Sequence, residues 1–153
     1  MRTLVAVFTP LAAALIGCSD ATSSLTGGLV EITIEQALTS QTTSAGTFQM
    51  SGSVVDAGST IEELTFGGPL DRSPVPVTFV RTLTGRQGTL TLRGSARISF
   101  ASPTVGTLDG EWTVEAATGQ YSSMRGTGTL SGRADFGTTP PSASLAYSGS
   151  VKK

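Results

Sequence analysis

The stretch GTLTLRGSARISF, residues 88–100, alternates between two kinds of side chain with a period of two. Its even positions hold Leu90, Leu92, Ile98 and Phe100 together with small residues, whereas its odd positions hold Thr, Ser and Arg. Successive side chains of a β-strand point to opposite faces of the sheet, so this alternation is typical of a strand with one buried face. The stretch therefore predicts a half-buried β-strand.

The same alternation recurs along the chain beyond residue 28. It is clear in residues 107–116, where Leu108, Trp112, Val114 and Ala116 share the apolar face, and in residues 124–136. Weaker examples lie at residues 29–36, 46–55, 60–66, 75–83 and 143–151. Breaks rich in Gly, Pro, Asp and Ser separate the segments, at DAGS (56–59), TGRQG (84–88), ASPTVG (101–106) and GTTPPS (137–142).

About eight strands with short connections favour antiparallel neighbours in up-and-down order. Closing them into a barrel removes the exposed sheet edges. We therefore expect an all-β domain over residues 29–153, a single antiparallel up-and-down β-barrel. A membrane-spanning barrel is the alternative, but the chain has only nine aromatic residues, too few for two interfacial girdles.

Composition excludes several classes of function. The formal net charge is −1 and no Lys/Arg cluster is present, which argues against nucleic-acid binding. One cysteine and no histidine exclude an internal disulfide and the commonest zinc sites. We expect no metal, no cofactor and no catalytic residues of a familiar type.

The first 28 residues predict export and attachment to a membrane. Residues 1–17 combine a positive start with a short apolar run, which is typical of a cleaved signal peptide. The sequence Leu15-Ile16-Gly17-Cys18 resembles the lipobox of bacterial lipoproteins, which implies cleavage before Cys18 and acylation of its sulfur. Residues 18–28 then form a lipidated, flexible tether. This resemblance implies anchoring in the cell envelope, with the outer membrane facing the periplasm favoured; an ordinary secretory leader is the alternative.

A second resemblance covers residues 85–130. The strand Gly110-Glu111-Trp112-Thr113-Val114 is followed by Thr118-Gly119-Gln120-Tyr121-Ser122-Ser123-Met124-Arg125-Gly126-Thr127-Gly128. This arrangement resembles bacterial domains of unknown function built on the allene oxide cyclase barrel. The resemblance implies the barrel fold, and plant members of that family bind an unsaturated fatty-acid epoxide inside the barrel. No matching set of polar residues carries that activity over to this chain.

Several residues have a plain structural interpretation beside a functional one. Trp112 is expected to fill the core, with the wall of a ligand cavity as the alternative, and Tyr121 to fix the neighbouring turn through its hydroxyl. Residues 66–76 form the longest irregular connection, a surface loop or a lid over the barrel. The charged residues of the central strands are expected on the solvated face, as cross-strand pairs or as a surface for an unidentified envelope protein partner. They are Arg93, Arg97, Asp109, Glu111, Glu115, Arg133 and Asp135.

An eight-stranded barrel has room either for packed side chains or for one small ligand. The residues expected to line such a cavity are Phe48, Met50, Phe79, Leu92, Phe100, Trp112 and Leu130. The same face carries several glycines, which either leave open space or let the wall coil tightly.

Three functions follow from these options: a non-catalytic envelope lipoprotein with a packed barrel, a carrier of a small hydrophobic molecule, and an isomerase or cyclase. A cavity open at one end favours the carrier. A carboxylate or amide buried in that cavity favours the enzyme.

Overall fold

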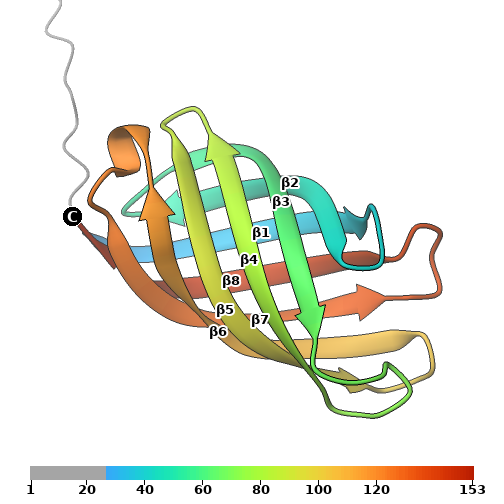
Figure 1. The fold of residues 1–153 in the computed structure, drawn as a ribbon. Helices are drawn as coiled ribbons and strands as arrows, with labels where there is room; N and C mark the ends of the chain where they lie inside the picture. The colour runs from blue at the N-terminus through green and yellow to red at the C-terminus, as the bar shows by residue number, and fades with distance from the viewer. Residues whose placement is uncertain (1–26) are drawn as a thin grey trace, which may run out of the picture.

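The computed structural model describes residues 27–153, which form a closed barrel of eight antiparallel strands (Figure 1). Each strand pairs with the next along the chain, and β1 pairs with β8 to close the sheet. The strands are β1 (Gly28–Leu38), β2 (Thr43–Gly52), β3 (Asp56–Phe66), β4 (Val75–Gly85), β5 (Thr89–Phe100), β6 (Val105–Ala117), β7 (Arg125–Asp135) and β8 (Ser142–Lys152). One short 3₁₀ helix, η1 (Gly119–Tyr121), joins β6 to β7.

The fold class expected from the alternating pattern is confirmed: the domain is an all-β, up-and-down barrel. The predicted signal peptide, the lipobox with Cys18 and the tether up to residue 26 lie outside the described residues. Within residues 27–153, no helix is both long enough and apolar enough to cross a membrane.

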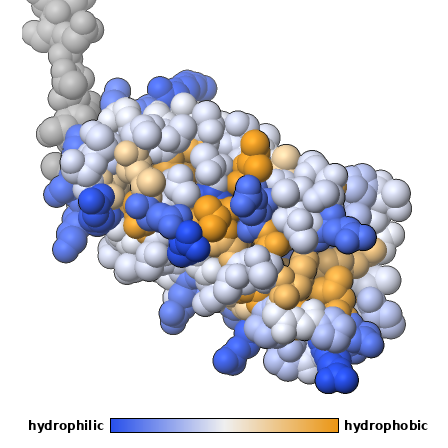
Figure 2. All heavy atoms as spheres, viewed as in Figure 1, coloured by the Kyte–Doolittle hydropathy of each residue, from blue (hydrophilic) through white to orange (hydrophobic). Residues whose placement is uncertain are grey.

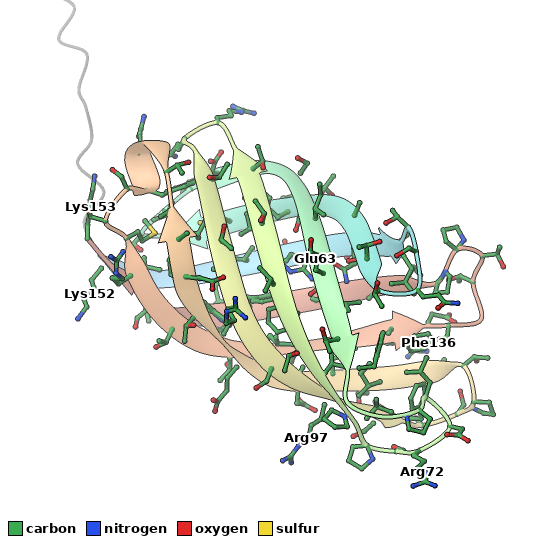
Figure 3. All side chains as sticks on the ribbon, viewed as in Figure 1. Glu63, Arg72, Arg97, Phe136, Lys152 and Lys153 are labelled. Atoms are coloured by element: carbon green, nitrogen blue, oxygen red, sulfur yellow. The ribbon has the colours of Figure 1, made fainter. Side chains whose placement is uncertain are left out.

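The barrel has two different ends. At the terminal end, β1 begins and β8 finishes, and η1 lies beside the β2–β3 and β4–β5 turns (Figure 1). At the loop end lie the four other connections, residues 39–42, 67–74, 101–104 and 136–141. Figure 3 shows Lys152 and Lys153 at the terminal end and Phe136 at the loop end.

Two of the expected strand details are wrong. Residues 56–59 are not a break but the first residues of β3, and the turn lies at residues 53–55. In β6 the pairing register shifts opposite Thr91 and Leu92, so one extra residue is accommodated there. This bulge reverses the alternation, and Ala116 is exposed while Ala117 packs against the core.

The barrel interior is largely filled by apolar side chains. The seven residues expected to line a cavity all point inward, and six of them are less than 5% exposed, the half-buried Phe100 being the exception. Trp112 lies over Gly128 and Gly149: a Cβ atom at these glycines would come within 2.7 Å and 2.5 Å of the indole ring. These inward glycines therefore make room for a large side chain rather than leaving open space.

The terminal end is closed by a buried contact between η1 and β3. The Tyr121 hydroxyl donates a hydrogen bond to the carboxylate of Asp56. The carboxylate also accepts from the backbone N–H groups of Ala57, Arg86 and Gln87, at 2.8–3.2 Å. Tyr121 thus bridges two distant segments, whereas the sequence predicted that it would fix only its own turn.

These contacts shift the protonation of both groups. Burial by itself raises the pKa of Asp56, but the hydrogen bonds from Tyr121 and the three backbone N–H groups outweigh it and leave the pKa below its usual value. Burial, together with the neighbouring Asp56 carboxylate, raises the pKa of Tyr121 well above that of a free phenol.

The outer face carries the charged residues of the central strands, as strand parity predicted. Arg93 and Glu115 form an exposed ion pair with nitrogen and oxygen 2.6 Å apart. Glu31 and Glu35 also point outward from β1 and accept hydrogen bonds from serines of β8. Such exposed contacts contribute little to stability. Arg97 extends away from the barrel wall (Figure 3).

Candidate functional site

An apolar pocket opens at the loop end of the barrel. It is lined by Gln36, Leu38, Glu62, Leu64, Phe66, Val77, Phe79, Ala96, Ile98, Leu108, Leu130, Ala134, Phe136, Pro141, Ser142, Ala143, Leu145 and Tyr147. All eight strands except β2 contribute to this lining. Figure 2 shows apolar residues exposed together at this end of the molecule, at the lower right of the view.

The pocket is narrow. The volume that water-sized molecules can occupy is about 60 Å³, whereas a single water needs roughly 10–15 Å³ on the same kind of measure. Pockets for drug-sized ligands typically reach about 300 Å³ or more. The space therefore suits a thin apolar chain or a very small ring.

Four residues with polar groups contribute to the lining: Gln36, Glu62, Ser142 and Tyr147. Leu38, Phe66 and Phe136 belong to strand ends or loops at the rim. Gln36 and Glu62 come two and four residues before the ends of β1 and β3, and Tyr147 lies five residues into β8. Ser142, the first residue of β8, lies at the loop end, whereas Glu62 and Tyr147 lie further along their strands.

Glu62 belongs to a buried ion pair. Its Oε1 atom lies 2.5 Å from Nη2 of Arg81, in an ionic contact whose angles do not fit a hydrogen bond. Its Oε2 atom accepts hydrogen bonds from Gln36 at 2.9 Å and from Ser44 at 3.0 Å. Arg81 and Glu62 are 0% and 3% exposed. Both carboxylate oxygens are thus already engaged.

Arg81 is buried in the barrel interior and is not one of the lining residues of the pocket. Its Nε atom donates to the hydroxyl of Tyr147 at 3.1 Å, and Nη1 donates to Thr60 at 3.1 Å. The guanidinium carbon also lies 5.5 Å from the centre of the Tyr147 ring. The cation is therefore held by β3 and β8, which flank the pocket.

Two lining residues, Gln36 and Tyr147, have buried polar groups with unused hydrogen-bonding capacity. Burial raises the pKa of Tyr147 to about 12, although the nearby Arg81 acts in the opposite direction. The phenol is therefore protonated at neutral pH, and because its oxygen accepts from Arg81, its own proton remains available for donation. The Oε1 atom of Gln36 is buried and has no hydrogen-bond partner among the described residues.

The Glu62–Arg81 ion pair leaves the site without net charge. The carboxylate and the guanidinium compensate each other, and the unpartnered amide oxygen of Gln36 is itself buried. Residues 27–153 contain no cluster of three or more Asp, Glu, His or Cys side chains that could hold a metal ion.

The residues expected to line a cavity are divided between the pocket and the core. Phe79 and Leu130 line the pocket. Phe48, Met50, Leu92 and Trp112 are buried in the main core, and Phe100 packs in a smaller cluster beside Phe136. The structure brings the first two to the pocket and leaves the other five outside its lining.

Sequence reasoning missed the buried ion pair of Glu62 and Arg81, although a signal was present. Arg81 has the same strand parity as the inward Val77 and Phe79, and Glu62 has that of Thr60 and Leu64. A charged residue at an inward-facing position of a strand indicates a buried partner, because burying an unpaired charge costs too much free energy. Two such residues of opposite sign on neighbouring segments predict an ion pair.

Comparison with known proteins yields no matching family model, no matching curated protein and no matching solved structure.

Proposed function

We propose that this barrel binds a small, predominantly apolar molecule in the pocket at its loop end. The observation that carries this proposal is the pocket itself, whose lining is predominantly apolar and also includes Gln36, Glu62 and Tyr147. A cavity open at one end of a barrel is the common arrangement of small-molecule carriers. Each methylene group that the wall removes from water contributes roughly 0.8 kcal/mol to binding.

Native mass spectrometry tests this proposal. Protein purified without detergent is expected to carry an additional mass that is lost on denaturation, or to acquire one after incubation with a lipid extract. A mass that remains that of the bare chain under both conditions contradicts the proposal. It would support the alternative from the sequence, a packed barrel that acts through its surface.

An isomerase or cyclase is the second candidate, because a carboxylate and an amide line the pocket. A general base must reach a proton on its substrate with a free lone pair. In Glu62 the oxygens are held by Arg81, Gln36 and Ser44, so proton abstraction would have to displace one of these groups. This engagement favours binding over catalysis.

We also propose that a lipid anchor attaches the barrel to the cell envelope. The anchor would lie in the outer membrane, with the barrel on the periplasmic side. The support is the Leu15-Ile16-Gly17-Cys18 sequence at the end of a short apolar run. Two or more acyl chains anchor a protein stably, whereas a single chain holds it only marginally. Cys18→Ser is expected to abolish incorporation of radiolabelled palmitate and to release the protein from the membrane fraction; unchanged labelling contradicts the anchor.

A further inference from the structure

We propose that the outer wall of the barrel at its terminal end docks on the surface of a bilayer that contains anionic phospholipids. The contact is made by the cations of Arg125 and Lys152 and by the exposed side chain of Leu29. This face lies at the opposite end of the barrel from the pocket, so the inference goes beyond the proposed binding of a guest. It adds a direct contact between the barrel and the membrane to the proposed lipid anchor.

Strand pairing places two cations side by side. Arg125 is the first residue of β7, and it pairs directly with Lys152, the last residue of β8. Both are exposed, whereas Val151 is buried, so the two cations belong to the outer face. They are far apart in the sequence, and the chain therefore shows no basic cluster along its length. Lys152 is visible at the terminal end in Figure 3.

No described carboxylate compensates these two cations. Neither forms an ion pair with another residue of the range 27–153. Glu115, on β6 at the same end, is already paired with Arg93. Nη1 of Arg125 donates to the backbone oxygen of Met124 at 3.0 Å, which leaves the positive charge uncompensated. Like charges directly opposite each other in a sheet repel, so an anion from outside would relieve an unfavourable contact.

Small hydroxyl side chains form a hollow beside the two cations. Thr113, Thr127 and Ser150 are successive partners across β6, β7 and β8, and all three are exposed. Together with Arg125 and Lys152 they line one shallow hollow in the outer wall. Guanidinium and ammonium groups hold phosphate through charge-assisted hydrogen bonds, and hydroxyls can donate further ones. The hollow thus fits the phosphate of a lipid headgroup.

Exposed apolar side chains adjoin the hollow. Leu29 of β1 pairs with Ser150 and is 75% exposed, and Val55 in the β2–β3 turn is 69% exposed. The two are close in the fold, because the N–H of Ser53 in that turn donates to the backbone oxygen of Leu29 at 2.8 Å. Cations beside exposed apolar side chains are the combination that holds a protein surface at a lipid–water interface. Free phosphate would use only the cations, whereas a bilayer uses both.

The proposed anchor brings this face to the membrane. Residues 19–27 separate Cys18 from Gly28, and a chain of this length reaches at most about 35 Å. Gly28 pairs with Val151, the neighbour of Lys152. In the proposed lipoprotein, the two cations therefore stay within reach of the bilayer surface.

Vesicle binding by a chain of residues 19–153 tests the inference. This chain lacks Cys18 but keeps all eight strands of the closed barrel and the core inside it, so it retains the fold. Its cosedimentation is measured with vesicles of equal parts phosphatidylcholine and phosphatidylglycerol, and with phosphatidylcholine alone. We expect at least about tenfold stronger partitioning to the anionic vesicles, and a preference that decreases as salt is added.

The double variant Arg125→Gln, Lys152→Gln tests the assignment of the cations. Each cation near an anionic membrane surface contributes roughly fivefold to partitioning, so this variant should lose at least about tenfold. Arg97→Gln, Arg133→Gln is the matched control. It changes the net charge equally but removes exposed cations of β5 and β7 that lie nearer the loop end. The control should keep most of the binding.

Leu29→Ser tests the apolar part of the contact. It is expected to weaken binding to the anionic vesicles by about fivefold, which corresponds to the burial of roughly half of a leucine side chain. Ile61→Ser is the matched control, because Ile61 is 62% exposed on β3 and lies outside the proposed surface.

Each of the other outcomes overturns a stated part of the inference. Equal binding to both kinds of vesicle contradicts it as a whole, and equal losses in the two double variants would show that only net charge matters. If Leu29→Ser binds like the unaltered chain and inorganic phosphate displaces the vesicles at constant ionic strength, the hollow is a site for free phosphate. These results leave the lipid anchor and the pocket untouched, because the tested chain lacks Cys18 and the pocket lies at the other end of the barrel.

Discussion

The guanidinium of Arg81 has no exposed surface, yet it reaches Glu62 and Thr60 on β3 and Tyr147 on β8. A charge is tolerated in an apolar interior only when a counter-charge and hydrogen bonds replace its hydration. Here the replacement comes from two strands that are not neighbours in the sheet. The ion pair itself joins the neighbouring strands β3 and β4, and the Arg81–Tyr147 hydrogen bond crosses the barrel interior from β4 to β8.

Removing one partner of this pair should cost more than removing both. Glu62→Gln leaves the guanidinium buried without a counter-charge and is expected to lower the free energy of unfolding by about 3–5 kcal/mol. The double variant Glu62→Gln, Arg81→Met replaces the charges with uncharged groups and should recover more than half of that loss. Urea unfolding of the single and double variants measures the difference; additive losses would contradict an energetic coupling between the two residues.

The Tyr121–Asp56 contact predicts a dependence of stability on acidity. The pKa of Asp56 is lowered in the folded protein from a reference value of 3.8, so its contribution is present above the unfolded-state pKa. That contribution is lost as the pH falls through the folded-state pKa. Tyr121→Phe removes one hydrogen bond to the carboxylate and should cost about 1.5–3 kcal/mol at neutral pH.

Urea midpoints measured at pH 7 and at decreasing pH below 4 test this prediction. The loss caused by Tyr121→Phe should shrink as the carboxylate is protonated. A loss of the same size at every pH would mean that the tyrosine contributes only through packing.

Strands β7 and β8 fit closely around the only tryptophan of the chain. The indole Nε1 atom donates to the backbone oxygen of Thr129 at 3.1 Å, and the ring lies over Gly128 and Gly149. The space at Gly128 and Gly149 is thus limited by the indole ring of Trp112, which belongs to β6, and not by the geometry of a turn.

Gly149→Ala is therefore expected to destabilise the barrel by about 1–3 kcal/mol, because the added Cβ would lie 2.5 Å from the indole ring and close to the backbone oxygen of Thr127. The emission of Trp112 during urea unfolding measures both the stability and the displacement of the ring. Gly68→Ala is the matched control, since no atom lies within 4 Å of the position that its added methyl group would take. Equal effects at both positions would contradict the packing argument.

Period-two alternation was sufficient to predict the strands because one face of each is buried and the other is solvated. The bulge in β6 was not predictable in this way, since it depends on the register with β5, and Ala116 and Ala117 are chemically identical. The start of β3 at Asp56 was missed for a related reason. A residue typical of turns is held in the strand by donors from η1 and the β4–β5 turn.

The candidate site was predicted only in part. Inward aromatic and aliphatic residues follow from strand parity, and Phe79 and Leu130 were found in that way. Which inward residues border open space depends on how side chains from eight strands fit together, and no pattern along one strand contains that information. The buried ion pair could have been predicted from the sequence, because Arg81 and Glu62 occupy strand positions whose neighbours two residues away face the interior.

At the scale of the whole molecule, the barrel is closed at one end by Tyr121 and Asp56 and open at the other. Filling the open end should abolish binding without unfolding the protein. Ala143→Leu places a larger apolar side chain in the pocket lining. It is expected to weaken the binding of 1-hexanol, a probe with a thin apolar chain, at least about tenfold, with a change in stability within about 1.5 kcal/mol.

Ala146→Leu, on the exposed face of the same strand, is the control and should bind normally. The measurements are NMR titration and urea unfolding of both variants. Undiminished binding by Ala143→Leu would place the guest elsewhere on the molecule.

The pairing of Gly28 with Val151 brings the first and last strands together at the terminal end, opposite the pocket. Anything attached to the chain directly before Gly28 or after Lys153, such as a sensor surface, a reporter or a second domain, is therefore held at the base of the barrel and leaves the loops around the pocket accessible. A membrane attachment through the preceding chain has the same effect. Guests would then be exchanged with the surrounding water or with a delivering protein, and not extracted directly from the bilayer.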